Sequence, residues 1–281
     1  MISKGLKYMI LATFLFALMN VFVKMIPNIP AVQVVLFRSV VSLVLSAAFL
    51  KGQRVNLWGN NKKLLLLRGA FGSVGLILYF YTLQAMPLAS AVTIQFLAPI
   101  FATILGIFIV REKVKPLQWF FFLLAFTGVV LVKGFDPRIT PWLFLVGIIS
   151  ALFSGLAYNV IRKLKLTEHP LVIVFYFPLV TIPFAGIWSY FNWVVPTPVE
   201  WGILLIVGVL TQLAQYFMTK AYQVEELSKV SSLQYIGIIY ALGFGFVLFD
   251  ELFNVMSYVG MAIMLIGVFA NVWYKNRISR V

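Results

Sequence analysis

The polar and apolar positions of this chain form long blocks rather than a short amphipathic repeat. A membrane-spanning helix needs about 20 mainly apolar residues to cross about 30 Å of hydrocarbon. Most of the uncharged runs are close to this length, and the run at 69–110 is twice as long. These runs extend over 8–23, 69–110, 116–132, 139–161, 170–199, 201–219, 230–249 and 252–274.

The long run at 69–110 contains Met86-Pro87. Proline cannot continue a preceding helix, so this run, extended upstream to Lys63, predicts two helices joined by a tight turn. A further span at 31–50 is interrupted only by Arg38. The pattern therefore predicts an all-α integral membrane protein. We expect ten transmembrane helices at 6–25, 31–50, 63–85, 88–110, 116–134, 139–161, 170–191, 200–220, 227–249 and 253–274.

Composition supports this interpretation, because 62% of the residues are hydrophobic and only 11% are charged. Soluble domains have about 45–50% apolar and about 25% charged residues. Ten apolar runs would leave a soluble fold without amphipathic helices to cover its core. The first run is too long for a cleavable signal peptide, and no small-residue cleavage site follows it. The lipid bilayer is thus a predicted partner.

The net charge of +14 has an uneven distribution along the chain. With the N-terminus inside, 17 Lys and Arg residues lie in predicted cytoplasmic segments, and only Lys24, Lys133 and Arg138 lie outside. Basic residues are enriched in the cytoplasmic loops of membrane proteins. We therefore predict cytoplasmic N- and C-termini, in the cytoplasmic (inner) membrane of a bacterium. The basic excess is a topology signal, and we expect no nucleic-acid partner.

The two halves of the sequence match without a gap at an offset of 139 residues. Such a match predicts five-helix repeats at 1–138 and 139–281. Because five is odd, the second repeat enters the membrane from the opposite face, an arrangement common among secondary transporters. The matched residues include Phe14 and Phe153, Asn20 and Asn159, Lys24 and Lys163, Gly69 and Gly208, Gln95 and Gln234, and Glu112 and Glu251.

Several motifs occur in a fixed order along the whole chain. They are Arg38 early in the second span, Pro99 in the fourth, Glu112 and Glu251 closing the fourth and ninth, and "RGAFGSVGLILYFYTLQAMPLASAVTIQFLAP" at 68–99. Together they resemble the EamA-type branch of the drug/metabolite transporter superfamily. Arg111 and Asp250 depart from the family, which commonly has Gly before that Glu. The resemblance implies transport of small metabolites, often amino acids or related compounds, in either direction. It also implies a central pocket between spans one, three and four and spans six, eight and nine.

Two arginines lie within predicted spans, where charge is costly and usually functional. Arg38 lies about 10 Å into its helix at 1.5 Å per residue, and no Asp or Glu occupies the middle of any span. It would attract a substrate carboxylate or phosphate or gate the external mouth. Alternatively, it would hold backbone carbonyls at a helix end or extend toward the membrane surface. We expect Arg68, near the cytoplasmic end of span three, to reach that surface.

Uncharged polar residues at middle depths form a second set of candidates. Gln95 and Gln234 are the main predicted substrate contacts because they are repeat mates. Amides also link helices, at about 0.6 kcal/mol per hydrogen bond on average, and this structural role stays open for each residue. The remaining members are Asn20, Asn159, Tyr79, Gln212, Gln215 and Tyr216, the last three on one face of span eight.

No catalytic or metal-binding pattern is present in the sequence. The chain has no Cys, and its single His169 is predicted to be solvated in a loop. We therefore expect no enzyme activity, no metal and no cofactor. The predicted function is secondary transport of a small-molecule substrate, as an exporter, importer or exchanger using alternating access. A channel-like or scaffold protein and a lipid-modifying membrane enzyme are the alternatives, and the sequence leaves the oligomeric state open.

Overall fold

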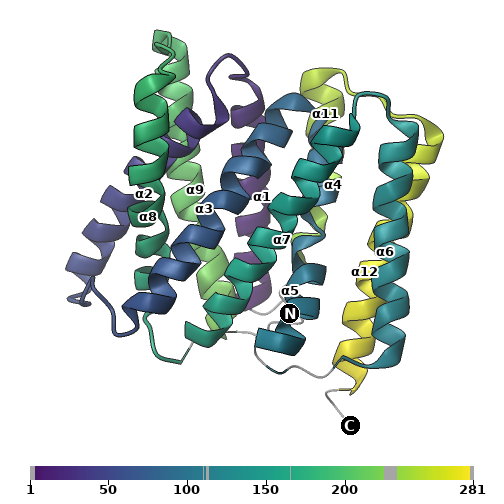
Figure 1. Ribbon diagram of the computed structural model, residues 1–281, viewed down its shortest axis with the longest axis horizontal. Helices are drawn as coiled ribbons and strands as arrows, with labels where there is room; N and C mark the ends of the chain where they lie inside the picture. The colour runs from purple at the N-terminus through teal and green to yellow at the C-terminus, as the bar shows by residue number, and fades with distance from the viewer. Residues whose placement is uncertain (1–3, 110, 112–113, 165, 225–232, 279–281) are drawn as a thin grey trace.

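The computed structural model describes residues 4–109, 111, 114–164, 166–224 and 233–278, and its regular structure in these residues is entirely α-helical (Figure 1). The helices follow the apolar runs of the sequence closely. They are α1 (Lys4–Lys24), α2 (Ala31–Gly52), α3 (Lys62–Ala85), α4 (Leu88–Gln95), α5 (Ala98–Ile109), α6 (Pro116–Phe135), α7 (Pro141–Leu164), α8 (Pro170–Phe191), α9 (Pro198–Val224), α11 (Ile236–Phe249) and α12 (Val255–Ile278).

Nine helices of the described residues are long and apolar enough to cross a membrane, counting α4 and α5 together as one interrupted helix. The apolar helix α11 is shorter, with 14 described residues. It occupies the second part of the predicted helix at 227–249, whose beginning lies outside the described residues. The tight turn at Met86-Pro87 is confirmed, because α3 ends at Ala85 and α4 begins at Leu88.

The single helix expected at 88–110 is interrupted in the structure. The interruption lies between Gln95, the last residue of α4, and Ala98, the first of α5. Pro99 is the second residue of α5 and has no N–H to donate to the carbonyl of Gln95, which explains the break. In the second half, α11 begins directly after Tyr235, and the Tyr235 and Phe96 ring centroids are 5.0 Å apart. The interruption between α4 and α5 therefore packs on the residue that precedes α11.

The helices pack in pairs across the bundle. Close partners are α1 with α9, α3 with α7, α2 with α8 and α6 with α12. Figure 1 shows α6 and α12 side by side at one edge and α2 with α8 near the opposite edge. Glycine permits two further approaches, of α3 to α8 and of α9 to α2, because a Cβ at Gly69 would lie 2.6 Å from Val180 and one at Gly208 would lie 2.6 Å from Val41. Both the glycines and the valines are separated by 139 residues.

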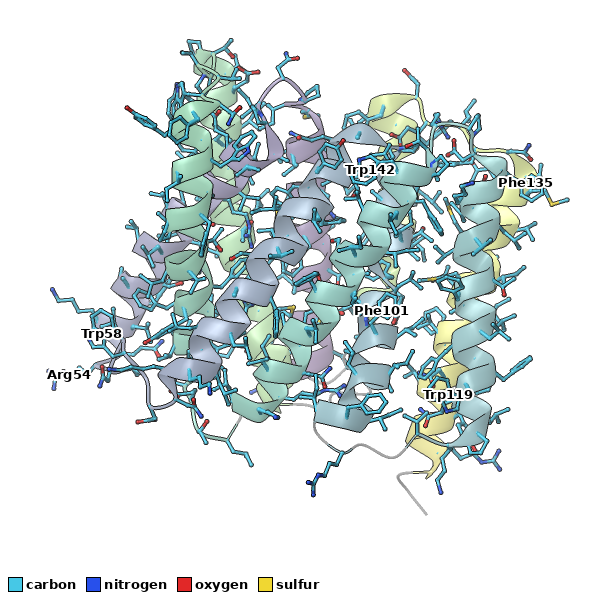
Figure 2. All side chains as sticks on the ribbon, viewed as in Figure 1. Arg54, Trp58, Phe101, Trp119, Phe135 and Trp142 are labelled. Carbon is cyan, nitrogen blue, oxygen red and sulfur yellow. The ribbon has the colours of Figure 1, made fainter. Side chains whose placement is uncertain are left out.

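Large apolar side chains cover the outside of the bundle. Trp58 and Trp142 are 60% and 62% exposed, and Figure 2 places them toward opposite ends of the helices. Trp119 lies toward the same end as Trp58. Tryptophan is enriched where a membrane protein meets the headgroup layers, so these positions fit an integral membrane protein.

Arg111 and Asp250, the two departures from the family pattern, have left-handed backbone conformations. Their φ angles are +58° and +50°, and Asp250 follows the last residue of α11. Glycine adopts this region without a Cβ penalty, whereas other residues are strained there. The conformation therefore favours glycine, the residue that the resemblance leads us to expect at these positions. The neighbouring Glu112 lies outside the described residues.

Candidate functional site

Arg38 points into the bundle from α2. Its side chain is 3% exposed, and its Nε donates a 2.9 Å hydrogen bond to Oγ1 of Thr211 on α9. The guanidinium carbon lies 5.9 Å from the ring centroid of Phe80 and 5.2 Å from that of Phe177. Arg38 is therefore held in the interior by a hydroxyl and two aromatic rings, away from the membrane surface.

Arg68 is also interior, which corrects the expectation that it reaches the cytoplasmic surface. The residue is 7% exposed, and its guanidinium carbon lies 4.4 Å from the ring centroid of Phe177 on α8. Gly72, one turn further along α3, makes room, because a Cβ there would lie 2.8 Å from Nη1 of Arg68. The Arg68 side chain thus extends along its own helix toward Gly72. Its Nε and Nη1 are buried without a hydrogen-bond partner.

The two arginines have no acidic partner among the described residues. The ion pairs of the described residues join Lys24 to Glu251 and Arg138 to Asp136, and neither includes Arg38 or Arg68. Arg38 and Arg68 both approach the ring of Phe177, so their like charges repel. Removing unpaired charges from water costs several kcal/mol per ion. The interior beside Phe177 therefore has a positive potential that favours an anion.

Hydroxyl and amide groups lie beside these cations. The buried Tyr79 lies beside the Asn20 side chain and Tyr158, and Tyr158 lies near Arg68. Oδ1 of Asn20 is buried without a hydrogen-bond partner. The structure therefore brings two predicted site residues, Asn20 and Tyr79, near the arginines. It adds Arg68, whose intramembrane charge was visible in the sequence but whose direction was not.

The side chain of Gln212, a residue of α9, faces α2. Its Oε1 accepts hydrogen bonds from Ser42 at 2.6 Å and Ser46 at 3.2 Å, whereas its buried Nε2 has no partner. Gln215 is partly exposed. Tyr216 stacks on Phe49 with 6.2 Å between the centroids. The predicted polar face of α9 therefore contributes Gln212 to the interior beside Arg38's partner Thr211, and Tyr216 to an aromatic contact with α2.

Gln95 and Asn159 join helices. Nε2 of Gln95 donates to Oγ of Ser154, and its Oε1 accepts from Ser150, both at 2.9 Å. Nδ2 of Asn159 donates to the carbonyls of Ala102 and Gly155 at 2.8 and 3.1 Å. These contacts give both amides a structural role. A substrate contact by Gln95 would have to replace the α7 serines, so that role stays a prediction.

Gln234, the repeat mate of Gln95, has different surroundings. It lies two residues before the first residue of α11, and its Nε2 lies 3.6 Å from Sδ of Met218 on α9. A thioether sulfur is a weak acceptor compared with a hydroxyl. The substrate role predicted for Gln234 therefore also stays a prediction.

Polar clusters also lie at the loop ends of the helices. Glu251 binds Lys24 at 2.9 Å and accepts from the backbone N–H of Leu88 at 2.8 Å. Arg138 donates to both carboxylate oxygens of Asp136, and these hydrogen bonds raise the pKa of Arg138. Glu251 thus connects the end of α1 to the start of α4, and it lies away from the two interior arginines.

The expected solvation of His169 fits the structure, in which the residue is exposed. It precedes α8, and its Nδ1 accepts from the backbone N–H of Leu171. Partial burial and the nearby Lys220 lower the pKa of His169 below its usual value. Across the described residues, no three His, Cys, Asp or Glu side chains gather in a way that would hold a metal ion.

Comparisons with known proteins agree with a transporter. The model of the EamA-like transporter family matches the chain twice, at residues 3–134 and 141–273. The chain is 31% identical to the "Pseudopaline exporter CntI" of Pseudomonas aeruginosa over 277 residues, covering 96% of each protein. It is 27% identical to "Solute carrier family 35 member G1" of Homo sapiens, covering 97% of this chain and 80% of that protein.

A solved crystal structure shares the fold. Its TM-score is 0.68 at 16% sequence identity, with 98% of this chain and 99% of that chain covered. At this low sequence identity, the match supports a shared fold and nothing about function. The family matches, in contrast, extend over both halves of the sequence and agree with the apolar helices and the absence of catalytic motifs. The chain is therefore an integral membrane protein that belongs to the EamA-like transporter family.

Proposed function

We propose that this protein is a secondary transporter of small organic metabolites that carry an acidic group, amino acids and related compounds included, and that it works by alternating access. The observation that carries the proposal is the buried Arg38, held by Thr211 and aromatic rings without an acidic partner in the described residues. An intramembrane charge facing the bundle interior marks substrate pathways in transporters. A substrate carboxylate would supply the missing counter-charge.

The proposal includes ten transmembrane helices in two inverted five-helix repeats, at 1–138 and 139–281. The two separate family matches support it. Hydrogen bonds at equivalent positions also support it. Oγ of Ser42 donates to Oε1 of Gln212. The residues offset from this pair by 139 positions are Thr181 and Ser73, and their hydroxyl oxygens lie 2.6 Å apart. Inverted repeats place a substrate near the midplane between the two halves.

We assign Arg38 to the acidic group of the substrate and Asn20 with Tyr79 to its polar groups. The free acceptor Oδ1 of Asn20 suits an ammonium or hydroxyl donor. Gln212 has a free buried donor nearby and is the next candidate. Gln95 and Gln234 form a further pair of candidates. Because one relative is named as an exporter, outward transport is the first direction to test.

Counterflow in liposomes tests the function. Purified protein should exchange a labelled amino acid or related acid with saturable kinetics, and Arg38→Gln should reduce uptake of acidic or zwitterionic solutes more than that of neutral ones. Arg54→Gln, at an exposed loop position, is the matched control. Ion conductance without saturation would favour a channel, and conversion of a lipid in detergent would favour an enzyme.

Single cysteines test the orientation, because the native chain has none. We propose cytoplasmic termini in the inner membrane of a bacterium, on the basis of the basic residues alone. A cysteine at the exposed Asn28 should react with an impermeant reagent from outside, whereas one at the exposed Asn60 should not. Reaction of Asn60→Cys from outside would reverse the orientation.

A further inference from the structure

We infer that the substrate carries two acidic groups, one bound by Arg38 and the other by Arg68. Both arginines lie beside the ring of Phe177. This inference rests on the proposed transport function and specifies its substrate class as dicarboxylates, acidic amino acids included. It depends on Arg68, whose interior position becomes visible only in the structure.

The charge balance of the interior supports two acidic groups. Both guanidinium carbons lie within 5.2 Å of the centroid of the same ring, and neither has a carboxylate partner among the described residues. A ligand with one negative charge would leave one buried guanidinium uncompensated. A ligand with two negative charges neutralises both and removes their mutual repulsion.

The available donors also fit two separate anchor points. Arg38 has one N–H engaged by Thr211, which fixes its position and leaves its terminal N–H groups for a ligand. Arg68 has two buried nitrogens, Nε and Nη1, without partners. Buried donors are almost always hydrogen-bonded, so unpaired donors on a charged group indicate a missing acceptor. The ring of Phe177 lies beside both anchors and offers an apolar surface to the ligand.

Helix packing does not itself require an arginine at position 68. The residue 139 positions further on is Val207, which is fully buried in α9. Similarly, the residue equivalent to Arg38 is Phe177, the ring that both arginines approach. The second half thus fills the corresponding places with apolar side chains, and the two cations belong to the first half only. This asymmetry points to binding chemistry rather than to a packing requirement.

Matched ligand pairs that differ by one charge test the inference. Thermal shifts of the purified full-length protein are measured with glutamate against glutamine, aspartate against asparagine, and succinate against succinamate. We expect at least one doubly acidic compound to bind about tenfold or more tightly than its partner, since each acidic group gains a charge-assisted hydrogen bond. Arg68→Gln should remove that preference, Arg68→Lys should retain part of it, and Arg54→Gln should leave it unchanged.

Stability without ligand provides an independent measurement. Arg68→Gln removes an uncompensated buried charge, so its melting temperature should equal or exceed that of the wild type. A purely structural Arg68 would instead give a destabilised variant. Equal binding within every pair, absence of binding by every doubly acidic compound, or an unchanged preference in Arg68→Gln would each overturn the inference. Saturable counterflow of singly charged or neutral solutes would then preserve the transport function, whereas absence of any counterflow would contradict that function itself.

Discussion

The ion pair between Lys24 and Glu251 offers a sharp test of how the two halves of the bundle are held together. Nζ of Lys24 lies 2.9 Å from Oε1 of Glu251 and donates to the carbonyl of Met86 at 2.6 Å. Oε2 of Glu251 accepts from the N–H of Leu88. The two side chains are 13% and 7% exposed, so this contact between the ends of α1, α4 and α11 is largely shielded from water.

Glu251→Gln removes the charge while keeping an oxygen for the N–H of Leu88. Loss of one partner from a buried ion pair costs about 3–5 kcal/mol. Residual exposure and the Met86 carbonyl compensate Lys24 in part, so we expect about 2–3 kcal/mol. For domains of 150–250 residues, 1 kcal/mol corresponds to about 2–4 °C in melting temperature. The variant should therefore melt about 5–10 °C below the wild type.

A double-mutant cycle in detergent measures the pair directly. Lys24→Met should destabilise the protein by a similar amount, and the double variant should lose clearly less than the sum, because no unpaired charge remains. Lys133→Met is the control, since Lys133 forms no ion pair with any described residue. Additive losses, with a coupling near zero, would refute the reasoning.

Three further changes have defined outcomes. Because burial lowers the pKa of His169 from 6.5, its contribution to stability is present above pH 6.5 and is lost as the pH falls below 6.5 through the lowered pKa of the folded state. The melting temperature should thus decrease from pH 7.5 to 5.5, and less so in His169→Asn, which keeps an acceptor that does not titrate. Arg111→Gly should stabilise the protein by about 0.5–1 kcal/mol and Asp250→Gly by less, because Asp tolerates a left-handed conformation better; equal or lower melting temperatures in both would contradict this. Gly208→Ala should cost about 1–3 kcal/mol by overpacking against Val41, and a second change, Val41→Ala, should restore part of that loss in thermal unfolding.

The sequence alone determined the membrane fold, because the length of an apolar run is measured against one external dimension, the bilayer thickness. It also located the turn at Met86-Pro87 and placed Arg38 within a span. The family resemblance was readable as well, since its motifs keep their order along the chain. All of these properties depend on neighbouring residues or on spacing.

Only the tertiary structure decided which side chains from distant segments contact each other. Arg68 lies in the interior because Gly72 leaves room for it and Phe177, from another helix, receives its guanidinium. The amide of Gln95 is engaged by Ser150 and Ser154, which no pattern around residue 95 reveals.

The interruption after Gln95 combines both levels. Pro99 removes a local hydrogen bond, which the sequence shows. Phe96 then meets Tyr235 across the bundle, which only the packing of α4 near α11 decides. A sequence specifies which side chains are polar, apolar or charged, whereas the direction of each one depends on the space its packed neighbours leave. That space therefore determined which of the polar side chains within the spans lie beside Phe177 and which only join helices.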